Sequence, residues 1–82
     1  MKLLIRNIAR SVTEKELKSM FAEFGQVQYC NLVLDKESGQ SKGFAFVEMP
    51  KVGEVKVAIK KLNNLELEGH KIRVKKADNT SN

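Results

Sequence analysis

One eight-residue segment constrains the fold of this chain more than any other stretch: Lys42-Gly43-Phe44-Ala45-Phe46-Val47-Glu48-Met49. Its pattern predicts a β-strand, because successive side chains of a strand point to opposite faces. One face would carry Lys42, Phe44, Phe46 and Glu48, and the other would carry Gly43, Ala45, Val47 and Met49. Burying a lysine and a glutamate is costly in desolvation, so the second face is expected to be the buried one. Two phenylalanines would then lie on the open face of a sheet.

The rest of the chain predicts three further strands and two helices. Apolar alternation indicates strands at residues 2–8, 27–34 and 71–75. Apolar residues at helical spacing indicate helices at residues 13–24 and 52–63. Pro50 is expected to end the strand that begins at Lys42. Residues 65–69 are expected to form a loop or a short hairpin.

The ends of the two helices carry their own signals. Thr13 and Glu16 have the spacing of a capping box at the start of the first helix. Gly25 is expected to cap the carboxyl end of that helix. Gly53 is expected to weaken the start of the second helix by up to ~1 kcal/mol. The pair Asn63-Asn64 would supply the left-handed residue that ends the second helix.

The element order βαββαβ predicts an α+β fold, a ferredoxin-like sandwich with both helices on one face of a four-stranded antiparallel sheet. The expected strand order is 4-1-3-2. Alternation places these side chains on the helix side: Leu3, Ile5, Cys30, Leu32, Ala45, Val47, Met49, Ile72 and Val74. It places these on the open side: Leu4, Arg6, Tyr29, Asn31, Val33, Phe44, Phe46, Glu48, Arg73 and Lys75. One domain is expected at residues 1–77, followed by a polar, frayed tail at 78–82.

Composition excludes several classes of protein. The chain has 82 residues, a net charge of +5 and a pI of about 9.5, which allows one small, basic domain. The single cysteine, Cys30, excludes an internal disulfide and a Cys-cluster zinc site. We expect Cys30 to be a small buried hydrophobe in a reduced, cytoplasmic protein. No apolar run reaches the length of a membrane span. His70 is expected in a solvated loop, and no cofactor or metal is predicted.

The positive charge is concentrated in the second half of the chain. Residues 1–41 hold 6 Lys/Arg against 5 Asp/Glu, whereas residues 42–82 hold 9 against 5. Lysines on the last strand could simply protect a sheet edge against aggregation. On the same face as two aromatic rings, however, they indicate binding of single-stranded nucleic acid, whose bases stack on rings and whose phosphates contact cations.

Two motifs carry a resemblance to a known family. The segment that begins at Lys42 fits the pattern K/R-G-F/Y-G/A-F-V-x-F/Y except at its last position, where Met49 replaces an aromatic residue. A second motif, which runs apolar, aromatic, apolar, any, Asn, Leu, appears as Leu3-Leu4-Ile5-Arg6-Asn7-Ile8 and departs from the pattern clearly only at its second position. On these residues the chain resembles the RNA-recognition-motif family, over residues 2–77.

The resemblance implies roles for particular side chains. Phe44 and Phe46 would contact bases or sugars, and Lys42 would contact phosphate. The last strand and the tail after it would close over the RNA through Arg73, Lys75 and Lys76. Leu4 stands where the family usually has a third stacking aromatic, which predicts weaker or more permissive binding. The full candidate RNA-binding set is Phe44, Phe46, Leu4, Arg6, Lys42, Asn31, Tyr29, Glu48, Arg73, Lys75 and Lys76.

The sequence therefore predicts a module that binds single-stranded RNA, or single-stranded DNA, and that serves in post-transcriptional regulation or as an RNA chaperone. The alternative is a protein-interaction module, which would bury the same apolar face against a protein partner or a second copy. An acylphosphatase-type hydrolase on this fold would need an anion-binding loop with an arginine. Ala9-Arg10-Ser11 is a poor candidate because it lacks glycines, so no enzymatic activity is expected.

Overall fold

The computed structural model describes residues 1–77, and the tail predicted at 78–82 lies outside the described residues. The elements follow the chain in this order: β1 (Lys2–Arg6), α1 (Glu14–Ala22), β2 (Tyr29–Leu34), β3 (Ser41–Glu48), α2 (Val52–Leu62), β4 (Glu66–Leu67), β5 (His70–Lys71) and β6 (Arg73–Lys76). The predicted order βαββαβ is confirmed, with the small β4–β5 hairpin inserted before the last strand. None of the helices in this part of the chain is long and apolar enough to cross a membrane.

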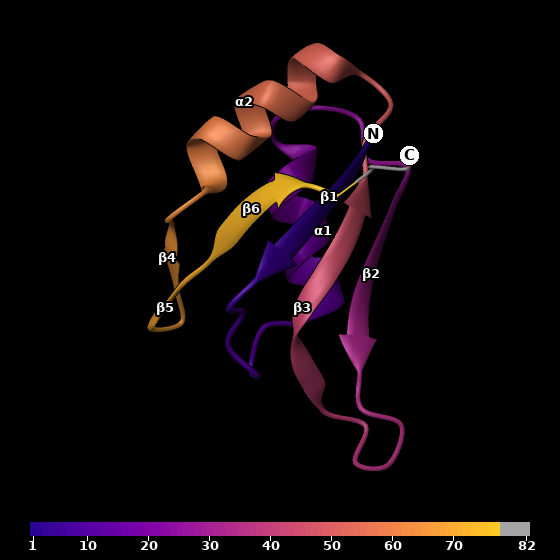
Figure 1. Ribbon diagram of the computed structural model, residues 1–82, viewed down its shortest axis with the longest axis vertical. Helices are drawn as coiled ribbons and strands as arrows, with labels where there is room; N and C mark the ends of the chain where they lie inside the picture. The colour runs from indigo at the N-terminus through magenta and orange to yellow at the C-terminus, as the bar shows by residue number, and fades with distance from the viewer. Residues whose placement is uncertain (78–82) are drawn as a thin grey trace.

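Four strands form one antiparallel sheet in the order β2-β3-β1-β6, which confirms the predicted order 4-1-3-2. Figure 1 shows the four strands side by side, with α1 behind the sheet. The apolar side chains predicted on the helix side are buried in one core with the inner faces of both helices, except for Cys30, which is only partly buried against it. The fully buried ones with the largest volumes are Phe21, Leu3, Ile5, Leu17, Met49, Ile72, Val47 and Val55. The other face of the sheet is left open.

The start of α1 has the predicted capping box. Thr13 Oγ1 accepts a hydrogen bond from the Glu16 N–H at 3.2 Å, and Glu16 Oε1 accepts one from the Thr13 N–H at 2.9 Å. These bonds satisfy two backbone donors that a helix start leaves unpaired. The helix then buries Leu17 and Phe21, two members of the predicted apolar stripe.

The predicted carboxyl cap of α1 is wrong. Gly25 does not adopt the left-handed conformation of a capping glycine; the glycines that have positive φ are Gly39, Gly43 and Gly69. A Cβ atom on Gly25 would instead lie 2.2 Å from Oε1 and 2.5 Å from Cβ of Glu54. The Glu54 carboxylate passes this point to accept the Gln26 N–H at 2.9 Å. Gly25 is therefore required by a contact with α2 rather than by the end of α1.

The end of α2 is fastened to β6. Asn64 supplies the predicted left-handed residue, with φ of 70°. Asn63, which precedes it, has an extended backbone, and its Oδ1 accepts the Val74 N–H at 2.9 Å. The hairpin that follows turns at Glu68 and Gly69, both with positive φ, as the type I′ turn of a two-residue hairpin requires. His70 lies in β5 and is exposed, so the predicted strand at 71–75 is divided between β5 and β6.

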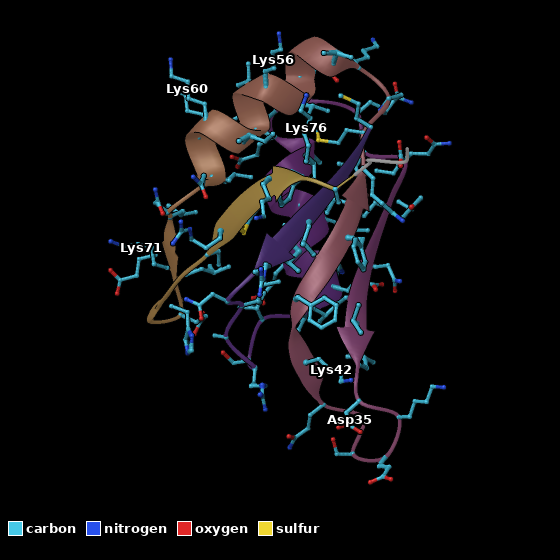
Figure 2. All side chains as sticks on the ribbon, viewed as in Figure 1. Asp35, Lys42, Lys56, Lys60, Lys71 and Lys76 are labelled. Atoms are coloured by element: carbon cyan, nitrogen blue, oxygen red, sulfur yellow. The ribbon has the colours of Figure 1, made fainter. Side chains whose placement is uncertain are left out.

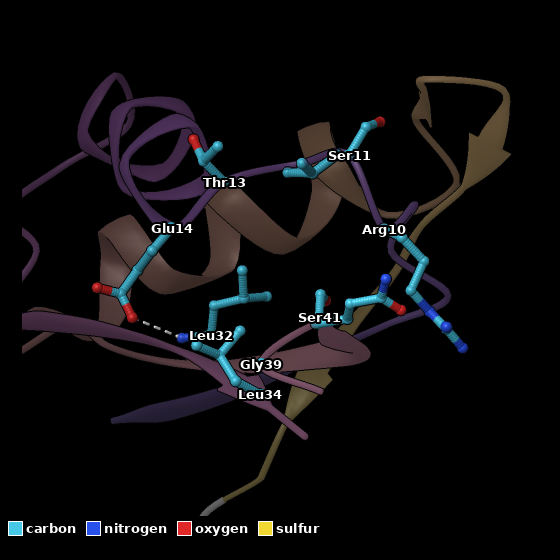
Figure 3. A pocket seen from close by; sticks show the side chains of 10 residues that line it. Arg10, Ser11, Thr13, Glu14, Leu32, Leu34, Gly39 and Ser41 are labelled. Carbon is cyan, nitrogen blue, oxygen red and sulfur yellow. Dashed lines mark hydrogen bonds between the residues drawn. The ribbon is translucent and has the colours of Figure 1, made fainter. Parts of the chain in front are cut away.

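The edge strand β2 ends at Leu34 as predicted, but its start and its pairing with β3 differ from a regular strand at 27–34. It begins at Tyr29 rather than at residue 27, and a register shift against β3 falls between Leu32 and Leu34. Leu34, which strict alternation would put on the same face as buried Leu32, is consequently 52% exposed. Figure 3 shows Glu14 at the start of α1 pointing to this strand, where its Oε2 accepts the Leu32 N–H at 2.8 Å. This bond occupies a backbone donor on an edge that could otherwise pair with another strand.

Cys30 is half-buried against the core, and burial raises the pKa of its thiol from 9.0 to about 11. The neighbouring charge of Glu14 adds to this effect, and that of Lys18 opposes it.

We predict that the Cys30 thiol is alkylated slowly in the folded protein. The thiolate fraction near pH 8 falls about 100-fold, and higher intrinsic nucleophilicity recovers about tenfold of that loss, so iodoacetamide should react roughly tenfold more slowly with the folded protein than with the urea-unfolded chain. Equal rates for the two states would contradict the burial of this thiol.

Two glycine substitutions should change stability in opposite directions. Gly25→Ala is expected to lower the free energy of unfolding by roughly 1–3 kcal/mol, because the new Cβ would overlap Glu54. Gly53→Ala, in the first turn of α2 with nothing within 4 Å of a new Cβ, is the matched control. It should raise the free energy of unfolding by about 0.5–1 kcal/mol, because alanine favours the helix. Urea denaturation of both variants measures the difference, and destabilisation by both would contradict the packing described for Gly25.

Candidate nucleic-acid interface

The strand register arranges the open face into transverse rows. In the central row, Phe46 of β3 lies opposite Asn31 of β2 and opposite Leu4 of β1, and Leu4 in turn lies opposite Lys75 of β6. Directly opposed side chains have Cβ atoms about 4.5–5.5 Å apart. An amide, an aromatic ring, an aliphatic side chain and an ammonium group therefore follow one another across the sheet.

The two phenylalanines form an edge-to-face pair. Their ring centroids are 6.1 Å apart and their planes are inclined at 89°, an arrangement favoured by the quadrupoles of the rings. Both rings are partly exposed, and Ala45 between them is fully buried. This confirms the predicted faces of β3. A base that lies flat against one ring meets the edge of the other, so the pair offers two differently oriented contacts.

Lys2 is a member of this face that the sequence prediction missed. Its Nζ lies 5.0 Å from the centroid of the Phe46 ring, within the range of a cation–π interaction. Strand alternation could have predicted this position, because Lys2 lies on the same face of β1 as Leu4 and Arg6. A base that stacks on this face of Phe46 would displace the ammonium group, which would then be available to a phosphate.

Glu48 lies opposite both Tyr29 and Lys2 at the end of β3. Its Oε2 accepts a hydrogen bond from the α-ammonium group of Met1 at 2.7 Å, and the same ammonium group donates to the carbonyl of Met49 at 2.6 Å. The carboxylate predicted to contact RNA is thus already paired with a cation. Tyr29 is 43% exposed at this end of the face.

A groove of about 410 Å³ lies at the opposite end of β3, beside Phe44; we call it the Phe44 groove. It is lined by Arg6, Asn7, Ile8, Arg10, Lys42, Gly43, Phe44 and His70. Arg10 was missed as a site residue, because it lies in a loop where strand alternation gives no information. It shares the groove with Lys42 because Ile8 N–H donates to the carbonyl of Gly43 at 2.9 Å. Gly43 has φ of 88°, a conformation that glycine adopts without the strain a side chain would bring.

Asp35 adds one negative charge beside the lysine and arginine side chains at this end of β3. Its Oδ1 accepts the Glu37 N–H at 2.8 Å and the Ser38 N–H at 3.4 Å, and these two bonds hold the pKa of the carboxyl below its ordinary value. The charges of Lys42 and Arg10 lower that pKa further. Figure 2 shows Asp35 and Lys42 together at the end of the β2–β3 connection.

A second groove, of about 670 Å³, follows the other edge of the sheet; we call it the β6 groove. It is lined by Arg6, Asn7, Asn63, Lys71, Arg73, Val74 and Lys75, with no acidic side chain among them. Arg6 and Arg73 lie directly opposite each other on neighbouring strands. Two like charges in this position destabilise a sheet, and a bound anion would relieve their repulsion. The β6 groove is thus suited to a polyanion.

The structure separates Lys76 from the open-face candidates. Lys76 lies opposite Leu3, which is fully buried on the helix side, and it has the same alternation as buried Val74. Its side chain therefore points to the helix side of the sheet. The other predicted members lie on or beside the open face: Phe44, Phe46, Leu4, Arg6, Lys42, Asn31, Tyr29, Glu48, Arg73 and Lys75.

Other hollows offer less chemistry. One of about 450 Å³ lies between the start of α1 and the β2–β3 connection, where Figure 3 shows Arg10, Thr13, Glu14, Leu34 and Ser41 around it. It combines polar loop residues with the side chains of Leu32 and Leu34. Within residues 1–77, no group of three or more His, Cys, Asp or Glu side chains is placed to hold a metal ion.

Known proteins match this chain over nearly its whole length. Residues 3–73 match the family model described as RNA recognition motif. RbpD of Nostoc sp., named as an RNA-binding protein, is 39% identical over 77 residues, which cover 94% of this chain and 82% of RbpD. The crystal structure of RNA Binding Protein PG1 has a TM-score of 0.91 and 32% identity, covering 100% of this chain and 99% of that one. A structure of Sxl-lethal protein in complex with RNA has a TM-score of 0.87 and 33% identity. The match covers 93% of this chain and 47% of that one.

Proposed function

The chain belongs to the RNA recognition motif family, and we propose on that basis that its open sheet face binds single-stranded RNA. The observation that carries the proposal is the opposed pair Arg6 and Arg73, in a groove without acidic lining, beside the rings of Phe44 and Phe46. Rings and unbalanced cations on one face are what stacked bases and phosphates require. The similarity to the Sxl-lethal structure, described as a protein–RNA complex, supports the same reading.

Each part of the face has a distinct role in this proposal. Phe46 and Phe44 stack on bases, and Asn31, next to Phe46, donates to and accepts from base edges. Leu4 contributes an apolar contact without a ring. Phosphates bind in the Phe44 groove and in the adjoining β6 groove, which share Arg6 and Asn7 and hold most of the cations of this face. The RNA thus crosses the strands.

The selectivity of this surface is expected to be low. Two rings and one amide side chain are few groups with which to read base identity, and stacking tolerates any base. Such a module suits post-transcriptional regulation or RNA chaperoning, and single-stranded DNA is a second ligand to test. The proposal gives the chain a binding role and no catalytic step. The cytoplasmic location and the domain boundary at residue 77 stay predictions.

Removal of both rings tests the proposal. Phe44→Ala with Phe46→Ala should weaken binding of a short single-stranded RNA by about 2–6 kcal/mol, from ~1–3 kcal/mol of stacking per base. Fluorescence anisotropy measures the affinity, and thermal unfolding checks that the fold persists. Val57→Ala, which shortens an exposed apolar side chain on α2, is the control and should bind like the parent.

The outcome against the proposal is equal RNA affinity for the double variant and the parent protein. Association of the parent with a protein or with itself that does not weaken as salt rises, without RNA binding, would favour the protein-interaction alternative instead.

Introduction of a third ring should have the opposite effect. Leu4 lies between Phe46 and Lys75 on the open side and is only partly buried, so Leu4→Phe adds a ring next to an existing one. One more stacked base should strengthen RNA binding by at least about 1 kcal/mol, or about fivefold. Leu4→Met, of similar size to leucine but without a ring, is the matched control. An equal gain from both substitutions would assign the effect to added apolar area rather than to stacking.

A further inference from the structure

The lysines of α2 lie on two different flanks of the helix. Val55, Ala58 and Leu62 are buried and set the side that faces the core. With 3.6 residues per turn, Lys56 and Lys60 fall on one flank, one turn apart, and Glu54 and Lys61 fall on the other. All three lysines are exposed. The helix therefore has an outer flank, defined by Lys56 and Lys60, that carries positive charge only.

Glu54 identifies the direction of each flank. Its carboxylate reaches the Gln26 N–H in the connection between α1 and β2, so the flank of Glu54 and Lys61 faces α1. Lys56 and Lys60 lie on the outer side of the helix, turned away from the buried residues, where α2 runs beside the β6 edge of the sheet. The bond from the Val74 N–H to Asn63 Oδ1 holds the end of α2 on that edge. Figure 2 shows Lys56 and Lys60 projecting outward from α2.

Lys76 connects this flank with the open face. Neighbouring residues of β6 point to opposite sides of the sheet, so Lys75 points to the open side and Lys76 to the side of α2. Figure 2 shows Lys76 below α2, between the helix and the sheet edge. Within residues 1–77, no ion pair joins Lys56, Lys60, Lys75 or Lys76 to an acidic side chain. Cations thus follow one another around the β6 edge, from the β6 groove to α2.

We propose that RNA bound on the open face continues around the β6 edge, where Lys76, Lys56 and Lys60 bind its phosphates. This inference rests on the proposed function, because the path begins at Arg73 and Lys75 in the β6 groove. It extends the interface to the covered side of the sheet, where no base platform is needed. The α2 flank then acts only on RNA that is longer than the sheet can hold.

Charge favours RNA backbone as the occupant. Lys56 and Lys60 are like charges one turn apart, which repel each other, and a phosphate between them removes that repulsion. The surface of α1 differs, since its exposed side chains carry both signs: Glu14, Lys15, Glu16 and Lys18. The basic flank is therefore a local property of α2, and it is continuous with the cations of the open face.

Two RNA lengths separate this inference from the proposed function. Oligouridylates of about 4 and about 12 nucleotides would be titrated by fluorescence anisotropy, because a sheet of this kind stacks two or three bases. Lys56→Gln with Lys60→Gln should leave the 4-mer affinity unchanged. It should lower the 12-mer affinity about tenfold at 0.15 M salt and reduce the log–log salt slope by about 1.4, because each phosphate contact contributes about 0.7.

Two controls test the position of the charges. Lys61→Gln removes a lysine from the other flank of α2, and Lys15→Gln with Lys18→Gln removes two from α1. Both should bind the 12-mer like the parent. Equal 12-mer affinity for the α2 double variant and the parent, or equal losses in the controls, would overturn the inference. Failure of the parent to bind either oligomer would overturn the proposed function, and this inference with it.

Discussion

The antiparallel pairing of β1 with β3 is the interaction on which the rest of the structure depends. On one side of these central strands, Leu3 and Ile5 lie opposite Val47 and Ala45 and close the core. On the other side, the same register places Leu4 opposite Phe46. A shift of one residue would move lysine and arginine into the core, so the burial of one face fixes the arrangement of the other. The fold and the candidate interface are therefore two results of a single register.

Local patterns were sufficient for the elements and the sheet order. Alternation in β3 and the apolar stripe of α1 are each contained in a few consecutive residues, as is the capping box at Thr13. The errors concern contacts between distant residues. The role of Gly25 depends on Glu54, whose carboxylate accepts the N–H of Gln26, 28 positions earlier in the sequence. The exposure of Leu34 depends on a register shift in the pairing of β2 with β3, which no local pattern reveals.

The same distinction applies to the site. Alternation located the open-face residues correctly, and it would also have located Lys2 and assigned Lys76 to the other side. Arg10 could not be found in this way, because it follows Asn7, whose φ of 60° ends the regular strand geometry. Its place beside Lys42 depends on the backbone contact between Ile8 and Gly43. The faces of a strand can be predicted from its own sequence, whereas the position of a loop residue depends on the distant segment that the loop contacts.

The cation over Phe46 has a consequence for the free protein. An uncovered apolar row on a sheet invites contact with any other apolar surface. With the Lys2 ammonium group above it, the ring presents a hydrated charge to solvent, and two copies that approach through this face meet charge against charge. The same lysine that a base would push aside thus disfavours contact between two copies through this ring. One side chain therefore both shields the ring in the free protein and leaves it open to a base that displaces the ammonium group.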